Sequence, residues 1–414
     1  MRRIFLLCFA ATCVFAQGPL RLDQAVQEAI DHNLNLFAER YNLTIADARI
    51  IQAKLRPNPV FSYGQDYQDL FQQGFTLANG AGPPEWNARV DFVFERGGKR
   101  GKRVNLAESL KTVAEFQLLN TIRQLRLDVE NAFLDVQAAR ESLALAQENY
   151  KSLEGIVEIN TARVRAGDLA EVELMRTRVA LMQFRSQVLQ NELKLRSAKN
   201  KLRLLVGRTA PAPDFDVEGT IRRDTSLIAL DDVRTDSLRL RPDLLAIQRD
   251  QARSQADLRL QIAQGKVDFT IGSQYHKQYG PIQASSMGVF FSAPIPVFNR
   301  NQGEIERAKR EDTQIEARIK AIQAQIDNEV ATAYDQYITS RSLVDSIEKT
   351  MIQQAREVRN ITEYSYRRGE ASFVEFLDAQ RAFNDTMQAY NDARADFARN
   401  LFLLESVSGR GVNP

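Results

Sequence analysis

Residues 61–64 are Phe-Ser-Tyr-Gly and residues 269–272 are Phe-Thr-Ile-Gly, with a tyrosine three positions further on in each case. The same separation of 208 residues relates residues 33–38 (Asn-Leu-Asn-Leu-Phe-Ala) to residues 241–246 (Arg-Pro-Asp-Leu-Leu-Ala). Each pair places the same kinds of side chain in the same order. The chain therefore contains an internal repeat, and its function is expected to depend on two equivalent halves.

The repeat continues towards the C-terminus at a slightly smaller separation. Ala132, Phe133 and Arg140 correspond to Ala333, Tyr334 and Arg341 at a separation of 201 residues, and residues 165–167 (Arg-Ala-Gly) correspond to residues 367–369 (Arg-Arg-Gly) at 202. We assign residues 17–207 to the first repeat and residues 241–414 to the second. Residues 208–240, rich in proline and aspartate, form the segment between them.

The first sixteen residues have the features of a secretion signal. Arg2 and Arg3 precede an apolar run, and residues 14–16 (Val-Phe-Ala) offer small side chains at a cleavage site. Removal of residues 1–16 would take both cysteines, Cys8 and Cys13, and would leave 55 minus 2, or 53, basic residues against 53 acidic ones. A chain without net charge is not expected to bind nucleic acid.

Most of the mature chain is predicted to be helical. Apolar or small residues follow one another in alternating steps of four and three, which is typical of a coiled-coil seam. In the first repeat they are Leu118, Ile122, Leu125, Val129, Ala132, Val136, Ala139, Leu143, Ala146, Tyr150, Leu153 and Val157. We expect one helix approaching 65 residues and two shorter helices, about 22–56 and 171–206 in the first copy, in each repeat. On this pattern alone, a periplasmic coiled-coil scaffold or adhesin remains an alternative.

Four strands are predicted where the helical pattern is interrupted, at about 58–67, 88–95, 266–275 and 287–297. In each strand apolar and aromatic residues alternate with polar or small ones. A soluble sheet would show the same alternation. The secretion signal and the absence of a hydrophobic helix of membrane-spanning length favour strands of an outer-membrane barrel. Four strands are too few to close a barrel, because the smallest have about eight, so three copies are expected to supply twelve.

Catalytic and metal-binding chemistry is not predicted. The chain has two histidines, His32 and His276, and neither lies near the serine, cysteine or acid partners that a catalytic triad requires. The five methionines after the signal are scattered, so we expect neither a metal site nor a cofactor. The basic run of residues 95–103 (Glu-Arg-Gly-Gly-Lys-Arg-Gly-Lys-Arg) lacks the residues of a phosphate-binding loop. It is expected to form a strand-to-helix elbow, where positive charge suits a membrane boundary.

These features resemble the TolC-type outer membrane efflux proteins, over about residues 20–408. The resemblance is carried by the duplicated order, the Arg-x-Gly turns, residues 241–245, and residues 294–303 (Pro-Ile-Pro-Val-Phe-Asn-Arg-Asn-Gln-Gly). The last run is most similar to the heavy-metal-efflux, CzcC-like branch. The resemblance implies a mainly α-helical homotrimer with a twelve-stranded barrel in the bacterial outer membrane and a helical barrel in the periplasm. Residues 208–239 would contribute to an equatorial collar.

The resemblance also implies partners and a function. The protein would be a passive exit duct, contacting outer-membrane lipid and docked to an inner-membrane pump, of RND type, through a periplasmic adaptor. The helix-turn tips at Gly167, Gly369, Arg165 and Arg367 would meet the adaptor. The cargo is expected to be divalent heavy-metal cations, with a drug or protein export duct of the same family as the alternative.

Residues that match the family at the periplasmic entrance are Glu375 and Asp378, which would form two acidic rings in a trimer. The close carboxylates would raise one another's pKa. Tyr366 and Glu173 match a tyrosine and an acid whose hydrogen bond holds the family's tip closed. The family's accompanying arginine is replaced by Ala371, which would weaken that closure unless Arg367 or Arg368 compensated.

Overall fold

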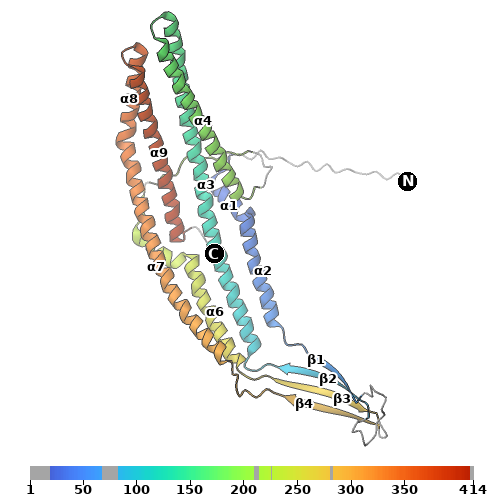
Figure 1. Cartoon of the computed structure of the whole chain (residues 1–414). Coiled ribbons are helices and arrows are strands. Elements are labelled where there is room, and N and C mark those ends of the chain that lie inside the picture. Colours follow the sequence, from blue (N-terminus) through green and yellow to red (C-terminus); the bar gives the residue numbers. More distant parts are fainter. Residues whose placement is uncertain (1–18, 68–82, 209–213, 225, 280–282, 411–414) are drawn as a thin grey trace, which may run out of the picture. The chain divides into compact units, whose positions relative to one another are not determined.

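The computed structural model describes residues 19–67, 83–208, 214–224, 226–279 and 283–410. The expected signal at residues 1–16 lies outside the described residues, as does most of the loop between the first two strands. The elements follow in chain order (Figure 1): α1 Leu22–His32, α2 Leu34–Lys54, β1 Val60–Asp66, β2 Glu85–Phe94, α3 Lys99–Ala166, α4 Glu171–Leu205, α5 Leu230–Leu240, α6 Pro242–Gln264, β3 Phe269–Gln278, β4 Ala284–Ser292, α7 Gln302–Ser346, the π-helical turn η1 Ile347–Met351, α8 Ile352–Arg368 and α9 Phe373–Ser408.

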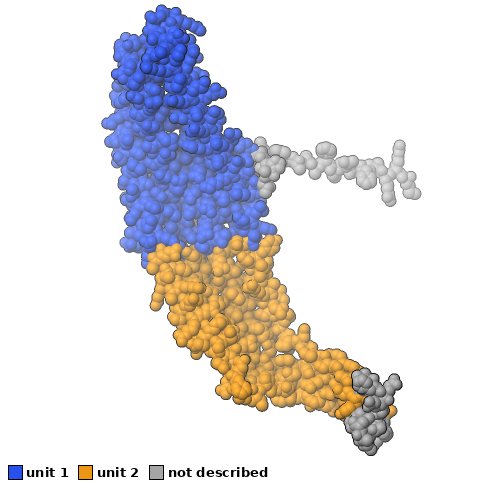
Figure 2. Space-filling model, in the orientation of Figure 1, with its two compact units in different colours: residues 1–38, 119–241, 326–414 blue, residues 39–118, 242–325 orange. Residues whose placement is uncertain are grey.

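The chain forms two compact units, and neither unit corresponds to one repeat. The first unit contains residues 1–38, 119–241 and 326–414, and the second contains residues 39–118 and 242–325 (Figure 2). Each unit therefore takes equivalent parts of both repeats. Among the described residues, no helix is both long and apolar enough to cross a membrane.

The second unit carries a four-stranded antiparallel sheet in the order β1-β2-β3-β4. Direct partners in neighbouring strands share a face, and Phe92 lies opposite Ile271, which lies opposite Phe291. The next position places Asp91 opposite Gly272 on the other face. The predicted separation into a mainly apolar and a mainly polar face is confirmed, although Val60, Val93 and Phe290 fall on the polar face. The Phe290 ring lies on the polar face, where the Arg89 guanidinium is 4.7 Å from its centre.

The strand limits differ from the expected ones for identifiable reasons. The fourth strand ends at Ser292 rather than near residue 297, because Pro294 and Pro296 have no amide hydrogen for the ladder. The third strand runs to Gln278 because Glu85, at the start of β2, pairs with it. Hydrogen bonds to β2 thus extend β3 beyond residue 275, where the strand was expected to end.

The helix expected at residues 22–56 is divided at Asn33, whose backbone leaves the helical region. The Asn33 side chain accepts a hydrogen bond from the Leu36 amide at 3.0 Å, which caps α2. The second repeat breaks at the equivalent residue, Arg241, where Pro242 begins α6. Both repeats interrupt the helix at the same point by different local chemistry.

The long helix is continuous in the first repeat and contains a π-turn in the second. Helix α3 spans 68 residues and passes through Gly155 without a break. In the second repeat, η1 separates α7 from α8 at residues 347–351. The separation between the repeats rises from 201 at Arg341 to 202 at Arg367, so the second copy has one extra residue in this interval. A π-turn accommodates one additional residue within a helix, which accounts for η1.

Candidate functional site

The helical hairpins of the first unit turn at the two predicted glycines. Gly167 and Gly369 have φ angles of 82° and 83°, a left-handed conformation that favours glycine. The amides at and after each glycine bond back to the last helical turn, as in a Schellman cap. Arg165 and Arg367 are exposed beside these turns, and Arg367 pairs with Glu363 on its own helix at 2.7 Å.

Behind the turns, a buried aromatic cluster joins the two hairpins. The Tyr366 ring lies 5.4 Å from the ring of Phe376, centre to centre, and 6.0 Å from that of Phe373. The first hairpin completes the buried cluster with Leu153 and Ile156 of α3 and Ala180 and Phe184 of α4. Ala371 packs against it from the side. Exclusion of water from this cluster makes any polar contact inside it strong and costly to lose.

A chain of neutral hydrogen bonds crosses the aromatic cluster. The Tyr366 hydroxyl donates to Asn160 Oδ1 at 2.9 Å, and Asn160 Nδ2 donates to Thr177 Oγ1 at 2.9 Å. The Thr177 hydroxyl in turn donates to the backbone carbonyl of Glu173 at 2.7 Å. Asn160 and Thr177 are fully buried and Tyr366 is 3% exposed. This hydrogen-bond chain, the Asn160 latch, links α8 to α3 and α4.

The direct hydrogen bond expected between Tyr366 and Glu173 is not formed in this structure. The Glu173 carboxylate pairs with Arg176 one turn further along α4, at 2.8 Å. An ionised carboxylate inside the aromatic cluster would lose its hydration, whereas the amide of Asn160 is neutral and offers both a donor and an acceptor. Within one chain, Arg367 pairs with Glu363, and Arg368 contacts Tyr364 and Glu370 near its own helix end.

The surroundings of Tyr366 keep its hydroxyl protonated. Burial raises the pKa of the Tyr366 phenol above its ordinary value, although the hydrogen bond to Asn160 opposes this effect. The ordinary phenol pKa, about 10, is already far above neutral pH. The hydroxyl therefore remains a donor throughout the physiological range.

The two acids proposed for the entrance are exposed on α9, one turn apart. The Glu375 carboxylate accepts hydrogen bonds from the backbone amide of Ser372 at 2.7 Å and from its hydroxyl at 3.0 Å. Both bonds hold the pKa of Glu375 below its ordinary value. The amide bond, together with the reciprocal bond from the Glu375 amide to Ser372 Oγ at 3.2 Å, forms a capping box at the start of α9. Asp378 is exposed on the next turn. Within one chain the pKa of Glu375 is thus lowered, and a rise would have to come from the carboxylates of other copies.

The segment between the repeats is held by equivalent arginines of the two copies. Arg140 donates to the backbone carbonyls of Val217 at 2.7 Å and Gly219 at 2.9 Å, and Arg341 donates to that of Ser226 at 3.2 Å. These interactions account for the presence of both arginines in the repeated pattern.

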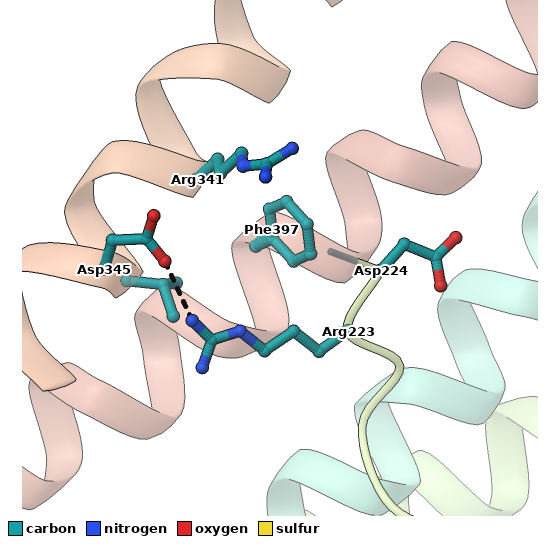
Figure 3. Close-up of a pocket in the computed structure, with 6 residues that line it drawn as sticks. Arg223, Asp224, Arg341, Asp345 and Phe397 are labelled. Carbon is teal, nitrogen blue, oxygen red and sulfur yellow. Dashed lines mark hydrogen bonds and ion pairs between the residues drawn. The ribbon is translucent and has the colours of Figure 1, made fainter. Parts of the chain in front are cut away.

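A small cavity of about 40 Å³ lies where this segment meets α7 and α9 (Figure 3). Arg223, which lines it, pairs with Asp345 at 2.8 Å and also contacts Glu348. Phe397 also lines the cavity and lies between Arg341 and Arg223 in the close-up (Figure 3). The ion pairs of Arg223 beside this small cavity anchor the segment to the helices.

Neither histidine belongs to a group with metal-binding character. His276 Nε2 lies 3.0 Å from a Glu85 carboxylate oxygen on the polar face of the sheet, and His32 bonds to the carbonyl of Glu28 on its own helix. In the described part of the chain, no cluster of three or more histidine, cysteine or acidic residues is placed to hold a metal ion.

Sequence reasoning missed Asn160 and Thr177, although a signal for Asn160 was present. The seam of α3 runs through Leu153 and Val157, and its next position, three residues on, is Asn160. A polar residue in an apolar seam often fixes register or pairing. The spacing alone did not reveal which side chain would meet it.

Comparison with known proteins gives a consistent result. The family model for outer membrane efflux proteins matches residues 25–208 and 233–410. Cobalt-zinc-cadmium resistance protein CzcC of Cupriavidus metallidurans is 24% identical over 395 residues, covering 95% of this chain and 91% of that protein. Nodulation protein T of Rhizobium leguminosarum bv. trifolii is 22% identical, covering 95% and 86%. The Campylobacter jejuni CmeC outer membrane channel has a similar fold, with a TM-score of 0.77 at 15% identity, covering 94% and 85%.

Proposed function

The chain belongs to the outer membrane efflux protein family, and from this premise we propose that three copies form a passive exit duct for divalent metal cations. It is an outer-membrane channel protein with a periplasmic helical extension, and not an enzyme. The proposal concerns the assembly, the cargo, the partners and the closure of the duct.

The four-stranded sheet is the main support for the proposed trimer. Among the described residues, the outer strands β1 and β4 each pair with one neighbour, which leaves both edges of the sheet free there. One face exposes large apolar side chains, with Phe61 68%, Val289 82% and Phe291 71% exposed. Free edges are not tolerated in lipid, so β4 of one copy must pair with β1 of the next. Three chains of four strands give a closed barrel of twelve.

The cargo proposal is supported by the similarity to the cobalt-zinc-cadmium resistance protein. The described residues hold no metal-binding cluster, which suits a duct that lets cations pass without retaining them. Selection would then belong to an inner-membrane pump of RND type, connected by a periplasmic adaptor that meets the tips at Gly167 and Gly369. A drug or protein export duct is the alternative cargo class.

At the entrance, we assign two elements different roles. Glu375 and Asp378 of three copies would form stacked acidic rings that attract cations. The Asn160 latch, with Tyr366 as its donor, would hold the tip closed by joining the two hairpins. The latch takes over the role first expected of Glu173.

Planar-bilayer recording of the purified protein tests the duct. We expect a detergent-stable trimer that conducts ions and prefers cations. A deletion strain should become sensitive to zinc, cobalt or cadmium salts, and sensitivity to organic drugs alone would favour the alternative cargo. A monomer without conductance would overturn the proposal and favour a periplasmic scaffold.

A further inference from the structure

A dense group of cations surrounds the junction between strands and helices in the second unit. Six of them are exposed: Lys54, Arg56, Arg96, Arg100, Lys266 and Arg300. Three more, Lys99, Lys102 and Arg103, are buried or half-buried in the same place. We call these nine residues the elbow patch.

Contacts between the segments show that these cations share one surface. The Arg100 guanidinium donates to the carbonyl of Lys54 at 2.7 Å, which joins the start of α3 to the end of α2. Lys99 Nζ pairs with Asp268 at 2.7 Å, which joins α3 to the entry of β3. The side chain of Lys266 lies against Gly97. The backbone carbonyl of Arg300 lies beside Gly265, next to Lys266. Four chain segments thus bring their positive charges to one end of the unit.

Few negative charges offset the elbow patch. The acids in contact with it are Glu95, which bonds Arg103 at 3.0 Å, and Asp268, which accepts from Lys99 and from the Arg96 amide at 2.8 Å. The side-chain partners of these two acids are the buried or half-buried cations Lys99 and Arg103. Among the described residues, none of the six exposed cations forms an ion pair. Nine cations and the two acids bonded to them thus lie together, in a mature chain expected to have no net charge.

Apolar side chains beside the elbow patch make its surface amphipathic. An open cavity of about 800 Å³ adjoins it, lined by Lys266, Pro294, Ile295 and Phe298 among others. Ile295 is 84% and Phe298 is 90% exposed. Aromatic side chains adjacent to arginine and lysine are typical of residues at a membrane–water boundary. The elbow lies where the strands end and the helices begin, which is the periplasmic boundary of an outer-membrane channel.

We propose that the elbow patch binds the phosphate of anionic phospholipids in the periplasmic leaflet of the outer membrane. This inference rests on the membrane placement of the proposed duct. The exposed cations would contact the headgroup phosphate while acyl chains cover Ile295 and Phe298. Each cation near an anionic membrane surface strengthens binding about fivefold. Lipid binding at the elbow patch would set the depth of the strands in the outer membrane.

Native mass spectrometry of the detergent-solubilised protein, titrated separately with phosphatidylglycerol and phosphatidylcholine, tests the proposal. The wild type should bind phosphatidylglycerol more tightly. The triple variant Arg56→Gln, Arg96→Gln, Lys266→Gln removes three exposed cations whose side chains make no hydrogen bond among the described residues. Its affinity for phosphatidylglycerol should fall about a hundredfold, three factors of five, with binding of phosphatidylcholine unchanged.

The matched control removes the same charge from exposed cations of α7 in the same unit, Lys309→Gln, Arg318→Gln and Lys320→Gln. This control should keep the preference for phosphatidylglycerol. Equal loss in both triple variants, or no loss in the elbow variant while the oligomer stays intact, would overturn the proposal. Displacement of the lipid by inorganic phosphate at constant ionic strength would show a simple phosphate site instead. Conductance in neutral-lipid bilayers tests the duct separately.

Discussion

Replacing Tyr366 with phenylalanine removes one hydroxyl from the Asn160 latch and keeps the ring in the aromatic cluster. The hydroxyl is the donor to Asn160 Oδ1, at 2.9 Å. Without it, that oxygen is left without its donor in a fully buried position, while the bond from Asn160 to Thr177 remains. The variant therefore weakens the link between the two hairpins without opening a large cavity.

The size of the effect follows from the burial of the contact. Leaving a buried polar group without its partner costs about 1–3 kcal/mol, or roughly a 5- to 150-fold change in an equilibrium. If the tip opens by separating the hairpins, water hydrates Asn160 in the open state and the penalty falls on the closed state alone. Three latches that open together would shift the balance by about 3–9 kcal/mol. The closed state should lose much of its population.

Single-channel recording in planar bilayers measures this shift directly. Tyr366→Phe should raise the mean conductance or the frequency of open events, and Asn160→Ala should do the same. Glu173→Ala should have little effect, because in this structure that carboxylate pairs with Arg176. The matched control is Tyr364→Phe, the same chemical change two residues away, where the hydroxyl is exposed and contacts Arg368.

Unchanged conductance of an intact Tyr366→Phe trimer would refute the role of the Asn160 latch. An equal effect of Tyr364→Phe would also refute it, since the gain would then reflect a general loosening of α8. A large effect of Glu173→Ala with none from Asn160→Ala would restore the phenol–carboxylate contact that the family resemblance implied.

Three further changes test other parts of the structure. Glu375→Ala combined with Asp378→Ala should reduce the preference for cations, and an unaltered reversal potential in a salt gradient would contradict the acidic rings. Burial raises the pKa of Glu130 despite its pairing with Arg126, so the folded chain keeps this proton at pH values where the unfolded chain has lost it. Stability should therefore fall as pH rises from about 4.3 through the raised folded pKa, and chemical denaturation of Glu130→Gln should show a weaker dependence in that range. Gly207→Ala should lower the midpoint of thermal unfolding, because φ is 78° and the new Cβ would collide with the carbonyl of His32. The left-handed conformation alone costs an alanine about 1–2 kcal/mol. The control Gly155→Ala lies in open space within α3 and should stabilise by about 0.5–1 kcal/mol; a loss there would contradict the argument.

The elements whose geometry depends on local residues could be predicted from the sequence. Alternation of Phe61 and Tyr63 with small or polar residues assigned the two faces of β1 correctly, because side chains on a strand point to opposite sides. Gly167 and Gly369 marked the hairpin turns, because a left-handed cap favours glycine. The capping box of Ser372 and Glu375 was also readable locally, from its three-residue spacing, although it was not recognised.

The internal repeat also predicted equivalence that the structure bears out. Asn33 and Arg241 occupy the same position in the two copies, and both divide a helix. The change in separation between Arg341 and Arg367 corresponds to the π-turn η1. One residue inserted into a packed helix has to be accommodated within about one turn. The change in separation between the repeats was therefore sufficient to predict a π-turn in this interval.

The partners of buried polar side chains depended on the tertiary structure. Tyr366 lies on α8, Asn160 on α3 and Thr177 on α4, and spacing along any one helix does not reveal which side chains of the other two will be within 3 Å. The same holds for the elbow patch, whose cations come from residues 54–56, 96–103, 266 and 300. By itself, the sequence determined the repeat, the strand faces and the turn positions, because these follow from backbone geometry and side-chain period. Only the tertiary structure decided which neutral amide meets the buried phenol and where charge gathers, because both require segments distant in the chain to converge.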